Sequence, residues 1–320
     1  MEIRLLEKKV PSTDGVHMLS GVVMIPEGEI RGIFQIVHGM TEYVMRYEQF
    51  MSRMADAGYI VCGYDHLGHG HTVNDKSELG FIAHKNGWKY LVDDIAVFAA
   101  SMKQEYGRDL PYILFGHSMG SFVARLSAAK YDFEDKLILS GTGGPNPATK
   151  AGISVLKKIK RIRGEHFVSE KINNLIFGTY NKRFGYDDPN NWLSNIEGVR
   201  KAYADDELCN YSFTVSALED LLRLSMESNK RRWFRSCVIK KPVLLLSGAD
   251  DPVGDYGMGV KKVHDRLRDN GTDVHFILYK NCRHELLNDL CREKVTQEII
   301  RFSEKADNQN ETETMEVNRQ

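Results

Sequence analysis

The sequence of 320 residues predicts an α/β fold, in which a mostly parallel sheet is wound by helices on both faces and an inserted helical segment forms a cap. Short apolar runs alternate with helical segments, which is the pattern of a parallel sheet with crossover helices. The alternation stops after residue 140 and resumes at Pro242. Helices inserted between two strands of a sheet indicate a cap over the strand ends, where it would wall a pocket.

The expected elements follow from apolar periodicity and from turn residues. The run at residues 32–37 is apolar throughout, as in a strand buried on both faces. Residues 88–106 place Leu91, Ile95 and Phe98 on one helical face. In chain order we expect strands at 4–10, 16–25 and 32–37, a helix at 47–57, a strand at 59–64, a helix at 88–106, a strand at 112–115, a helix at 121–130, and strands at 136–140, 243–246 and 274–279.

This reading divides the chain into three parts. Residues 1–140 and 237–302 would form the core, and residues 141–236 the helical cap. Residues 303–320 are polar, and we expect them to be a disordered tail.

Composition excludes several classes of protein. Lys and Arg total 43 against 44 Asp and Glu, so global steering of nucleic acid is not expected. No run of apolar residues is long enough for a transmembrane helix, and the first residues lack the apolar region of a signal peptide. The five cysteines are scattered and odd in number, which is typical of a reduced, cytoplasmic protein.

The most informative motif lies at residues 116–120, which read Gly-His-Ser-Met-Gly. An apolar strand precedes it and a helical stretch follows it, so the motif predicts a nucleophile elbow. The glycines allow a turn too tight for side chains at their positions. Ser118 would then stand above the sheet at a helix N-terminus, where backbone N–H groups favour developing negative charge.

A nucleophilic serine requires a base and a group that orients the base. An acidic pair, Asp250 and Asp251, follows the predicted strand at 243–246, and His284 follows the strand at 274–279. The ends of such strands are where a sheet enzyme keeps its chemistry. The order serine, acid, histidine is that of the α/β-hydrolase triad. From the residues alone, Asp250 and Asp255 remain rivals to Asp251 as the orienting acid.

Several segments together resemble the monoacylglycerol lipase/lysophospholipase group of α/β-hydrolases, which overlaps the serine aminopeptidase family. The resemblance runs from about residue 10 to about residue 302. The matching segments are 38–40 (His-Gly-Met) with Arg46-Tyr47, 65–70 (Asp-His-Leu-Gly-His-Gly), 116–120, 248–252 (Gly-Ala-Asp-Asp-Pro) and 284–287 (His-Glu-Leu-Leu).

This resemblance implies an α/β-hydrolase fold and a triad of Ser118, Asp251 and His284, because the family places its acid directly before the residue matching Pro252. The oxyanion hole is expected from the backbone N–H groups of Met119, which follows the nucleophile, and Met40.

The resemblance also suggests substrate-binding residues. Glu42 and Arg46 stand where the glycerol lipases hold the head group, although the pair is equally consistent with a surface salt bridge. Trp192 lies in a segment that resembles bacterial members, and it either lines the acyl tunnel or packs. Where the glycerol lipases carry a second histidine after the catalytic one, this chain has Leu287.

The segment at 65–71 contains three histidines and raises the possibility of a metal site. No convincing further carboxylate or thiolate ligand accompanies them, and a serine triad needs no metal. We therefore expect no metal and no cofactor, and interpret the segment as a Gly-rich loop that packs beside the elbow.

The leading functional hypothesis is a carboxylic ester hydrolase acting on single-chain lipids or small acyl esters. A serine aminopeptidase is an alternative, because acidic residues of the cap could bind an α-ammonium group. A thioesterase and a non-enzymatic ligand binder are further alternatives. The cap acids are Glu165, Glu170, Asp205 and Asp206.

The segment at 154–163 is amphipathic and is consistent with peripheral membrane contact through the cap or with simple packing. One predicted face is apolar and the other basic. The apolar face comprises Val155, Leu156, Ile159 and Ile162, and the basic face Lys157, Lys158 and Arg161.

Overall fold

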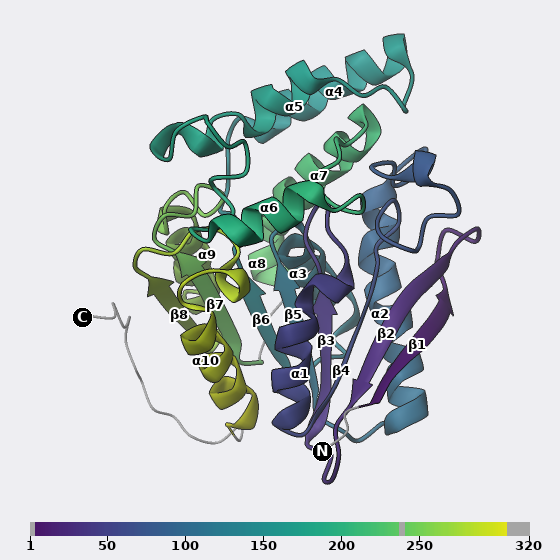
Figure 1. Ribbon diagram of the computed structural model, residues 1–320, viewed down its shortest axis with the longest axis vertical. Helices are drawn as coiled ribbons and strands as arrows, with labels where there is room; N and C mark the ends of the chain where they lie inside the picture. Colours follow the sequence, from purple (N-terminus) through teal and green to yellow (C-terminus); the bar gives the residue numbers. More distant parts are fainter. Residues whose placement is uncertain (1–3, 237–240, 306–320) are drawn as a thin grey trace.

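The computed structural model describes residues 4–236 and 241–305, and within these ranges the chain forms one eight-stranded sheet flanked by helices (Figure 1). The strand order is β1-β2-β4-β3-β5-β6-β7-β8. β1 and β2 pair antiparallel, β2 and β4 pair antiparallel, and every pairing from β4 to β8 is parallel. The strands are β1 (Arg4–Pro11), β2 (Met18–Ile25), β3 (Gly32–Val37), β4 (Tyr59–Tyr64), β5 (Tyr112–His117), β6 (Lys136–Ser140), β7 (Val243–Gly248) and β8 (Val274–Tyr279).

The central strands are buried at every position, because helices cover both faces of the sheet. In β3, Phe34 and Ile36 face one core cluster, whereas Ile33 and Val37 face the other. The first cluster is covered by α1 (Glu48–Asp56) and α10 (Arg292–Glu304), and the second by α2 (Gly87–Tyr106), α3 (Met119–Tyr131) and α9 (Met258–Arg268). This arrangement confirms the predicted fold class.

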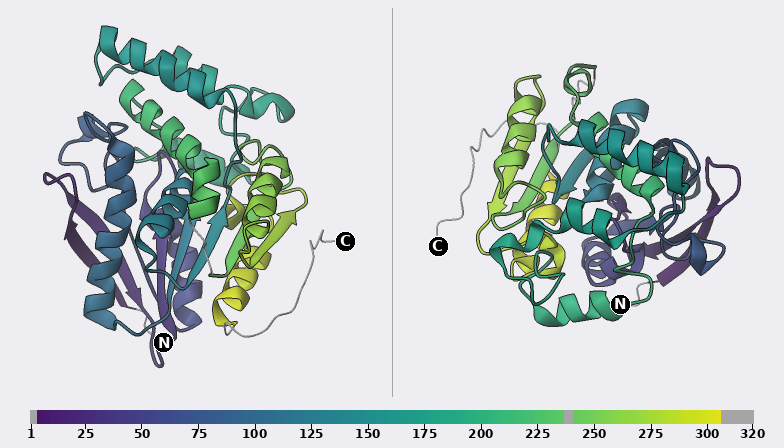
Figure 2. Two further views of the ribbon diagram at one scale, coloured as in Figure 1. Left: turned by 180° about the vertical axis from the view of Figure 1, so that it is seen from behind. Right: turned by 90° about the horizontal axis from the view of Figure 1, so that it is seen from above.

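The insertion between β6 and β7 lies over one end of the sheet, and α4 and α5 are its outermost layer (Figures 1 and 2). Helix α4 packs on α7, and α7 packs on α3 and α2 of the core. Thus α7 links the outer layer to the core. The inserted helices are α4 (Thr149–Arg163), α5 (Glu170–Phe177), α6 (Glu197–Asp205), α7 (Val215–Ser228) and α8 (Arg231–Ser236); short 3-10 turns lie at Val44–Tyr47, Lys76–Glu78, Tyr180–Arg183 and Leu286–Asn288.

The apolar face predicted for the segment at 154–163 is only partly buried. Leu156 is buried, but Val155 is 52% exposed and Ile162 is 80% exposed. Helix α4 belongs to the outermost layer and packs on α7, and its buried residues are Thr149, Ile153 and Leu156.

The predicted end of the core at residue 302 needs correction, and most of the predicted tail falls outside the described ranges. Helix α10 continues through Glu304 and Ser303 is buried, so the core extends beyond residue 302. Residues 306–320 of the predicted tail lie outside the described residues, as do residues 237–240 at the predicted resumption of the core. No helix in the described ranges is long and apolar enough to span a bilayer.

Candidate active site

Ser118 occupies a strained turn between β5 and α3. Its backbone has φ 51° and ψ −120°, a left-handed conformation that is unusual for a residue with a side chain. Its N–H donates to the carbonyl of Ser140 at 2.9 Å. A Cβ atom at Gly116 would lie 2.7 Å from the carbonyl oxygen of Gly120, and one at Gly120 would lie 2.2 Å from that of Val37. Only glycine fits at both flanking positions.

His284 and Asp251 form a buried pair in which Nδ1 of His284 lies 3.0 Å from Oδ1 of Asp251. The side chains are 2% and 0% exposed. Burial lowers the pKa of His284, but the charge of Asp251 and the hydrogen bond to it prevail, and the pKa rises above its ordinary value. Nε2 of His284 has no hydrogen-bond partner among the described residues. This nitrogen is therefore free to serve another group.

Of the three acids considered as the orienting group, Asp251 contacts His284. Oδ1 of Asp251 also accepts the N–H of Val253 at 2.8 Å, which fixes the carboxylate. Asp250 is half-buried, with its N–H on the carbonyl of Cys282, and Asp255 is exposed.

The imidazole of His284 lies against the elbow. Its ring centroid is 4.8 Å from that of His117, the residue before Ser118. A Cβ atom at Gly141, which has φ 61°, would lie 2.9 Å from Cε1 of His284. Burial, followed by the charge of His284, lowers the pKa of His117 to about 3, so His117 is a neutral neighbour. The structure thus places the pair of Asp251 and His284 against His117, the residue that directly precedes Ser118.

The two predicted oxyanion donors come from segments that flank Ser118. Met119 is the first residue of α3. Met40 follows Gly39, where an added Cβ atom would lie 3.2 Å from Cβ of Ser118. The loop after β3 therefore passes directly beside the predicted nucleophile.

Comparison with known proteins places this fold and site in a family. A family profile described as serine aminopeptidase, S33, matches residues 28–291. The chain belongs to the S33 family. It shares 25% identity with a monoacylglycerol lipase of Mycolicibacterium smegmatis, over 88% of this chain and 93% of the relative. It shares 27% identity with a probable lysophospholipase L2 of Haemophilus influenzae, over 36% of each chain.

Among solved structures, that of a thermostable carboxyl esterase from Bacillus coagulans in complex with glycerol superposes on this protein with a TM-score of 0.87. The two share 29% identity, over 94% of this chain and 98% of the esterase. These relatives confirm the predicted α/β-hydrolase family and the predicted class of carboxylic ester hydrolase.

In this S33 hydrolase, Glu42 and Arg46 are engaged with each other and with Glu285. Arg46 donates to Oε2 of Glu42 at 2.8 Å, and donates to both carboxylate oxygens of Glu285 at 2.9 Å each. The remaining oxygen of Glu42 accepts the N–H of Gly39 and, at 2.8 Å, the hydroxyl of Tyr47. Glu42 and Glu285 are buried. The predicted head-group residues therefore form an internal network.

The electrostatics of this network follow from burial and from Arg46. Burial raises the pKa of Glu42 above its usual range even beside Arg46. For Glu285 burial acts in the same direction, but the bidentate contact with Arg46 prevails and lowers the pKa. Sequence reasoning did not identify Glu285, although its position next to His284 is a signal that could have drawn attention to it.

Trp192 lies against His284, the predicted base. Its ring centroid is 4.9 Å from the imidazole of His284 and 5.0 Å from the ring of Tyr180. The ring of Tyr180 in turn contacts Phe177 at 5.8 Å. Burial, followed by the charge of Asp251, raises the pKa of Tyr180 to about 12. Aromatic rings thus lead from the end of α5 to His284, and sequence reasoning missed Tyr180 and Phe177.

Hydrogen bonds connect the segment around Trp192 to the loop that carries His284. The N–H of Glu285 donates to the carbonyl of Leu193 at 2.8 Å, and Arg283 donates to the carbonyl of Ser194 at 3.0 Å. The hydroxyl of Ser194 donates to the carbonyl of Asn288 at 2.8 Å. This part of the insertion supports the loop of His284, whereas α4 and α5 lie farther out (Figure 1).

The histidine-rich loop at residues 65–71 packs against the loop after β3, which carries His38 and Met40. The rings of His66 and His69 lie 4.2 Å and 5.3 Å from that of His38. Burial lowers the pKa of His66 to about 3 and that of His69 to about 4, so both are neutral. Nε2 of His38 accepts the N–H of His66 at 2.9 Å. Within the described ranges, these histidines do not gather into a group with the spacing of metal ligands.

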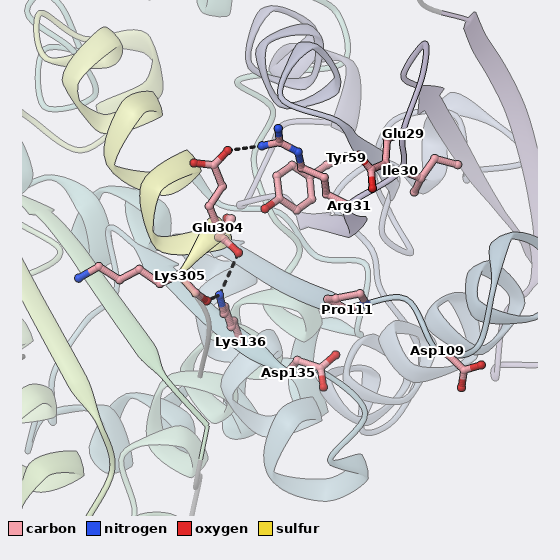
Figure 3. A pocket seen from close by; sticks show the side chains of 11 residues that line it. Glu29, Ile30, Arg31, Tyr59, Asp109, Pro111, Asp135, Lys136, Glu304 and Lys305 are labelled. Atoms are coloured by element: carbon pink, nitrogen blue, oxygen red, sulfur yellow. Dashed lines mark hydrogen bonds and ion pairs between the residues drawn. The ribbon is translucent and has the colours of Figure 1, made fainter. Parts of the chain in front are cut away.

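A cavity of about 700 Å³ lies at the opposite end of the sheet (Figure 3). It is lined by residues near the amino ends of the parallel strands, such as Arg31 and Lys136, and by the end of α10. Arg31 pairs with Glu304, and Lys136 donates to the carbonyls of Phe302 and Ser303, so the charged groups there hold α10. In sheets of this class the chemistry is found at the carboxyl ends of the strands.

Proposed function

We propose that this S33 family member cleaves carboxylic esters of single-chain lipids, of the monoacylglycerol or lysophospholipid type, or small acyl esters. Ser118 forms the acyl-enzyme in this proposal. One observation carries it: the buried imidazole of His284, hydrogen-bonded to Asp251 at 3.0 Å, rests on the strained elbow of Ser118. The similarity to proteins named as monoacylglycerol lipase and carboxyl esterase supports the substrate class.

In this proposal the chemistry is divided among Ser118, His284 and Asp251. Asp251 accepts a hydrogen bond from Nδ1–H of His284, which keeps the proton on Nδ1 and leaves Nε2 free to act as the base. Ser118 attacks the ester carbonyl while Nε2 takes its proton, and the resulting imidazolium donates that proton to the departing alcohol. Water then attacks the acyl-enzyme, with His284 again as the base, and releases the fatty acid.

Negative charge develops on the carbonyl oxygen in the tetrahedral intermediates. The N–H groups of Met119 and Met40 are the proposed donors to this oxygen. Such a donor typically contributes about 3 kcal/mol to lowering the barrier. The hydrogen bond from the N–H of Gly39 to Glu42 would hold the loop that carries Met40.

We assign Glu42 and Arg46 a positioning role, in place of direct contact with the substrate's head group. Their polar atoms are committed to Glu285, Gly39 and Tyr47. Trp192 keeps its proposed role in substrate binding, because its ring covers the imidazole and continues into the aromatic residues Tyr180 and Phe177. An apolar wall beside the base suits an acyl chain.

Peripheral contact of the cap with an anionic lipid surface is part of the proposal. The outer surface of α4 and α5 combines exposed apolar and basic side chains, which is the pattern of an interfacial helix. The apolar members, Val155, Ile162 and Leu175, are 52%, 80% and 79% exposed, and the basic members are Lys157, Lys158 and Arg161.

Aminopeptidase activity is the second candidate, because the family description names it. Three of the four cap acids considered for binding an α-ammonium have other partners, and the fourth, Glu170, is exposed on α5. Glu165 pairs with His84, Asp205 with Lys201, and Asp206 accepts the hydroxyl of Tyr43 at 3.0 Å. These contacts favour the ester reading over the aminopeptidase reading.

The decisive experiment is a hydrolysis profile of the purified protein. Esters and thioesters of increasing acyl length are compared with aminoacyl amides under the same conditions. The proposal expects ester cleavage with an optimum in acyl length. Faster cleavage of aminoacyl amides than of every ester would favour the aminopeptidase candidate and overturn the proposal.

A further inference from the structure

We propose that His84, Glu165 and His166 form a binding site for a divalent transition-metal ion of the zinc type, which links the outer cap to the core. This site does not rest on the proposed ester hydrolysis, and none of the triad residues contributes to it. His84 belongs to the core segment before α2, whereas Glu165 and His166 lie between α4 and α5.

The donor atoms are already close together. One ligand atom from each of the three side chains lies within 4.8 Å of the other two. In a tetrahedral zinc site with bonds of about 2.0–2.1 Å, neighbouring ligand atoms are about 3.3 Å apart. His84 Nδ1 pairs directly with a carboxylate oxygen of Glu165, so an ion would enter between these two atoms. Their side chains are 75% and 30% exposed, and such side chains adjust at low cost.

Hydrogen bonds to backbone carbonyls hold both ligand-bearing segments against the start of α7. Thr214 donates its hydroxyl to the carbonyl of Gly80 at 3.0 Å, and the hydroxyl of Ser216 donates to that of Ala83 at 3.0 Å. From the other side, the N–H of Val215 donates to the carbonyl of Phe167 at 2.9 Å. Residues 80–83 and 165–167 are thus held in register with each other before any ion binds.

The ring of Phe81 orients one ligand. It stacks on the imidazole of His166, with ring centroids 3.9 Å apart and an interplanar angle of 28°. The rings of His84 and His166 are 6.1 Å apart and nearly perpendicular, at 82°. The two imidazoles are thus not stacked face to face, and one ligand atom of each lies within 4.8 Å of one from the other.

The donor set selects the class of ion. Two imidazoles and one carboxylate suit zinc and its neighbours in the transition series, whereas magnesium and calcium prefer all-oxygen sites. Because the site is exposed, water would complete a four-coordinate ion. Among the described residues this is the one group of three potential ligands with such spacing.

Such an ion would restrain the outer cap. It would connect the turn between α4 and α5 to the loop before α2, in addition to the hydrogen bonds through α7. Because α4 rests mainly on α7, this link would limit movement of the outermost layer relative to the core.

The test is a titration of tag-free protein with zinc chloride by calorimetry, repeated with cobalt to follow ligand-field absorption. The variants are His84→Gln, Glu165→Gln and His166→Gln. The matched control is His275→Gln, because His275 also lies beside a carboxylate, that of Asp273 at 3.4 Å, without a third ligand.

We expect one zinc ion per chain. Each ligand variant should weaken zinc binding about tenfold or more, since even outer-sphere partners of a metal are worth about that much. The control should bind zinc like the unaltered protein. Zinc should also raise the Tm of the unaltered protein and the control, but not that of the ligand variants, which reports binding without any measurement of activity. The absence of saturable zinc binding, or equal zinc affinity in all four variants, would overturn the proposal.

Discussion

Arg46 donates two parallel hydrogen bonds of 2.9 Å to the carboxylate of Glu285, the residue that follows His284. Arg46 also holds Glu42, whose carboxylate accepts the N–H of Gly39. One guanidinium therefore connects the loop that carries a proposed oxyanion donor to the loop that carries the proposed base. Two parts of the proposed catalytic apparatus, which come from distant stretches of sequence, are fixed relative to each other in this way.

This connection predicts a large effect on stability. Arg46→Met leaves two buried carboxyl groups without their cation, and breaking such a pair typically costs about 3–5 kcal/mol of unfolding free energy. The exposed pair of Arg53 and Glu293 supplies the control, since Arg53→Met should cost less than about 1 kcal/mol. Urea unfolding measures both. Equal small losses for the two variants would show that the Arg46 network does not hold the loops.

The pH dependence of hydrolysis should report the same network. His284 must be neutral to act as a base, so activity falls as the pH drops through its pKa. The charge of Asp251, followed by those of Glu285 and Glu42, raises this pKa against the effect of burial. On the acid side of the pH–activity curve, the loss of activity should therefore occur at a pH above the ordinary pKa of histidine. Glu285→Gln removes one of these negative charges and should move this loss of activity to lower pH.

The measurement is kcat/KM against pH for a short soluble ester. The exposed carboxylate of Glu293 provides the comparison, as Glu293→Gln should leave the acid-side pKa in place. If the acid-side pKa of the kcat/KM profile is unchanged in Glu285→Gln, or moves to higher pH, the electrostatic account is contradicted.

The choice of orienting acid gives a comparison between neighbouring residues. Asp251→Asn should lower kcat about 10⁴-fold, because the amide cannot hold the imidazole in the required tautomer. Asp250→Asn should retain most of the activity, since Asp251 rather than Asp250 contacts His284. Steady-state kinetics on both variants decides between them, and the reverse ranking would transfer the role to Asp250.

Docking of the cap on lipid predicts an effect that depends on charge and salt. Reversing the charges at Lys157, Lys158 and Arg161 should weaken binding to vesicles that contain anionic phospholipid. The effect should shrink with added salt, because screening acts over about 10 Å at 0.1 M. Hydrolysis of a short soluble ester should stay nearly unchanged.

The control for this experiment reverses an equal number of exposed charges on α9, at Lys261, Lys262 and Arg268. Vesicle binding is measured by cosedimentation. If the α4 and α9 variants lose binding equally, or if neither does, α4 is an ordinary packing helix.

Local patterns predicted much of this fold. The strands β3 to β7 are buried on both faces, so their continuous apolar runs locate them well. The strained elbow could be anticipated because a Gly-x-Ser-x-Gly turn between strand and helix has few alternatives. The exposure of Val155 and Ile162 could not be anticipated, because it depends on what packs over α4 rather than on the sequence of the helix itself.

Sequence motifs indicated candidate site residues near one another in sequence, but they could not indicate the contacts between distant segments. Glu285 binds Arg46 across more than two hundred positions of sequence, and no local pattern encodes that pairing. The contact of Tyr180 with Trp192 and the meeting of His84 with Glu165 likewise depend on how the insertion folds back. Glu42 and Arg46 were correctly singled out as a pair, but their third partner changes the role that we assign to them.

The central claim is that Ser118 is the nucleophile, and labelling with a fluorophosphonate followed by peptide mapping tests it most directly. The account predicts one adduct, on Ser118, with labelling slowed in His284→Ala and absent in Ser118→Ala. Loss of a triad nucleophile lowers kcat by about 10⁶-fold, so Ser118→Ala should also be inactive on esters while remaining folded. An adduct on another residue, or a folded Ser118→Ala variant that keeps ester hydrolysis within about tenfold of the unaltered protein, would contradict the account.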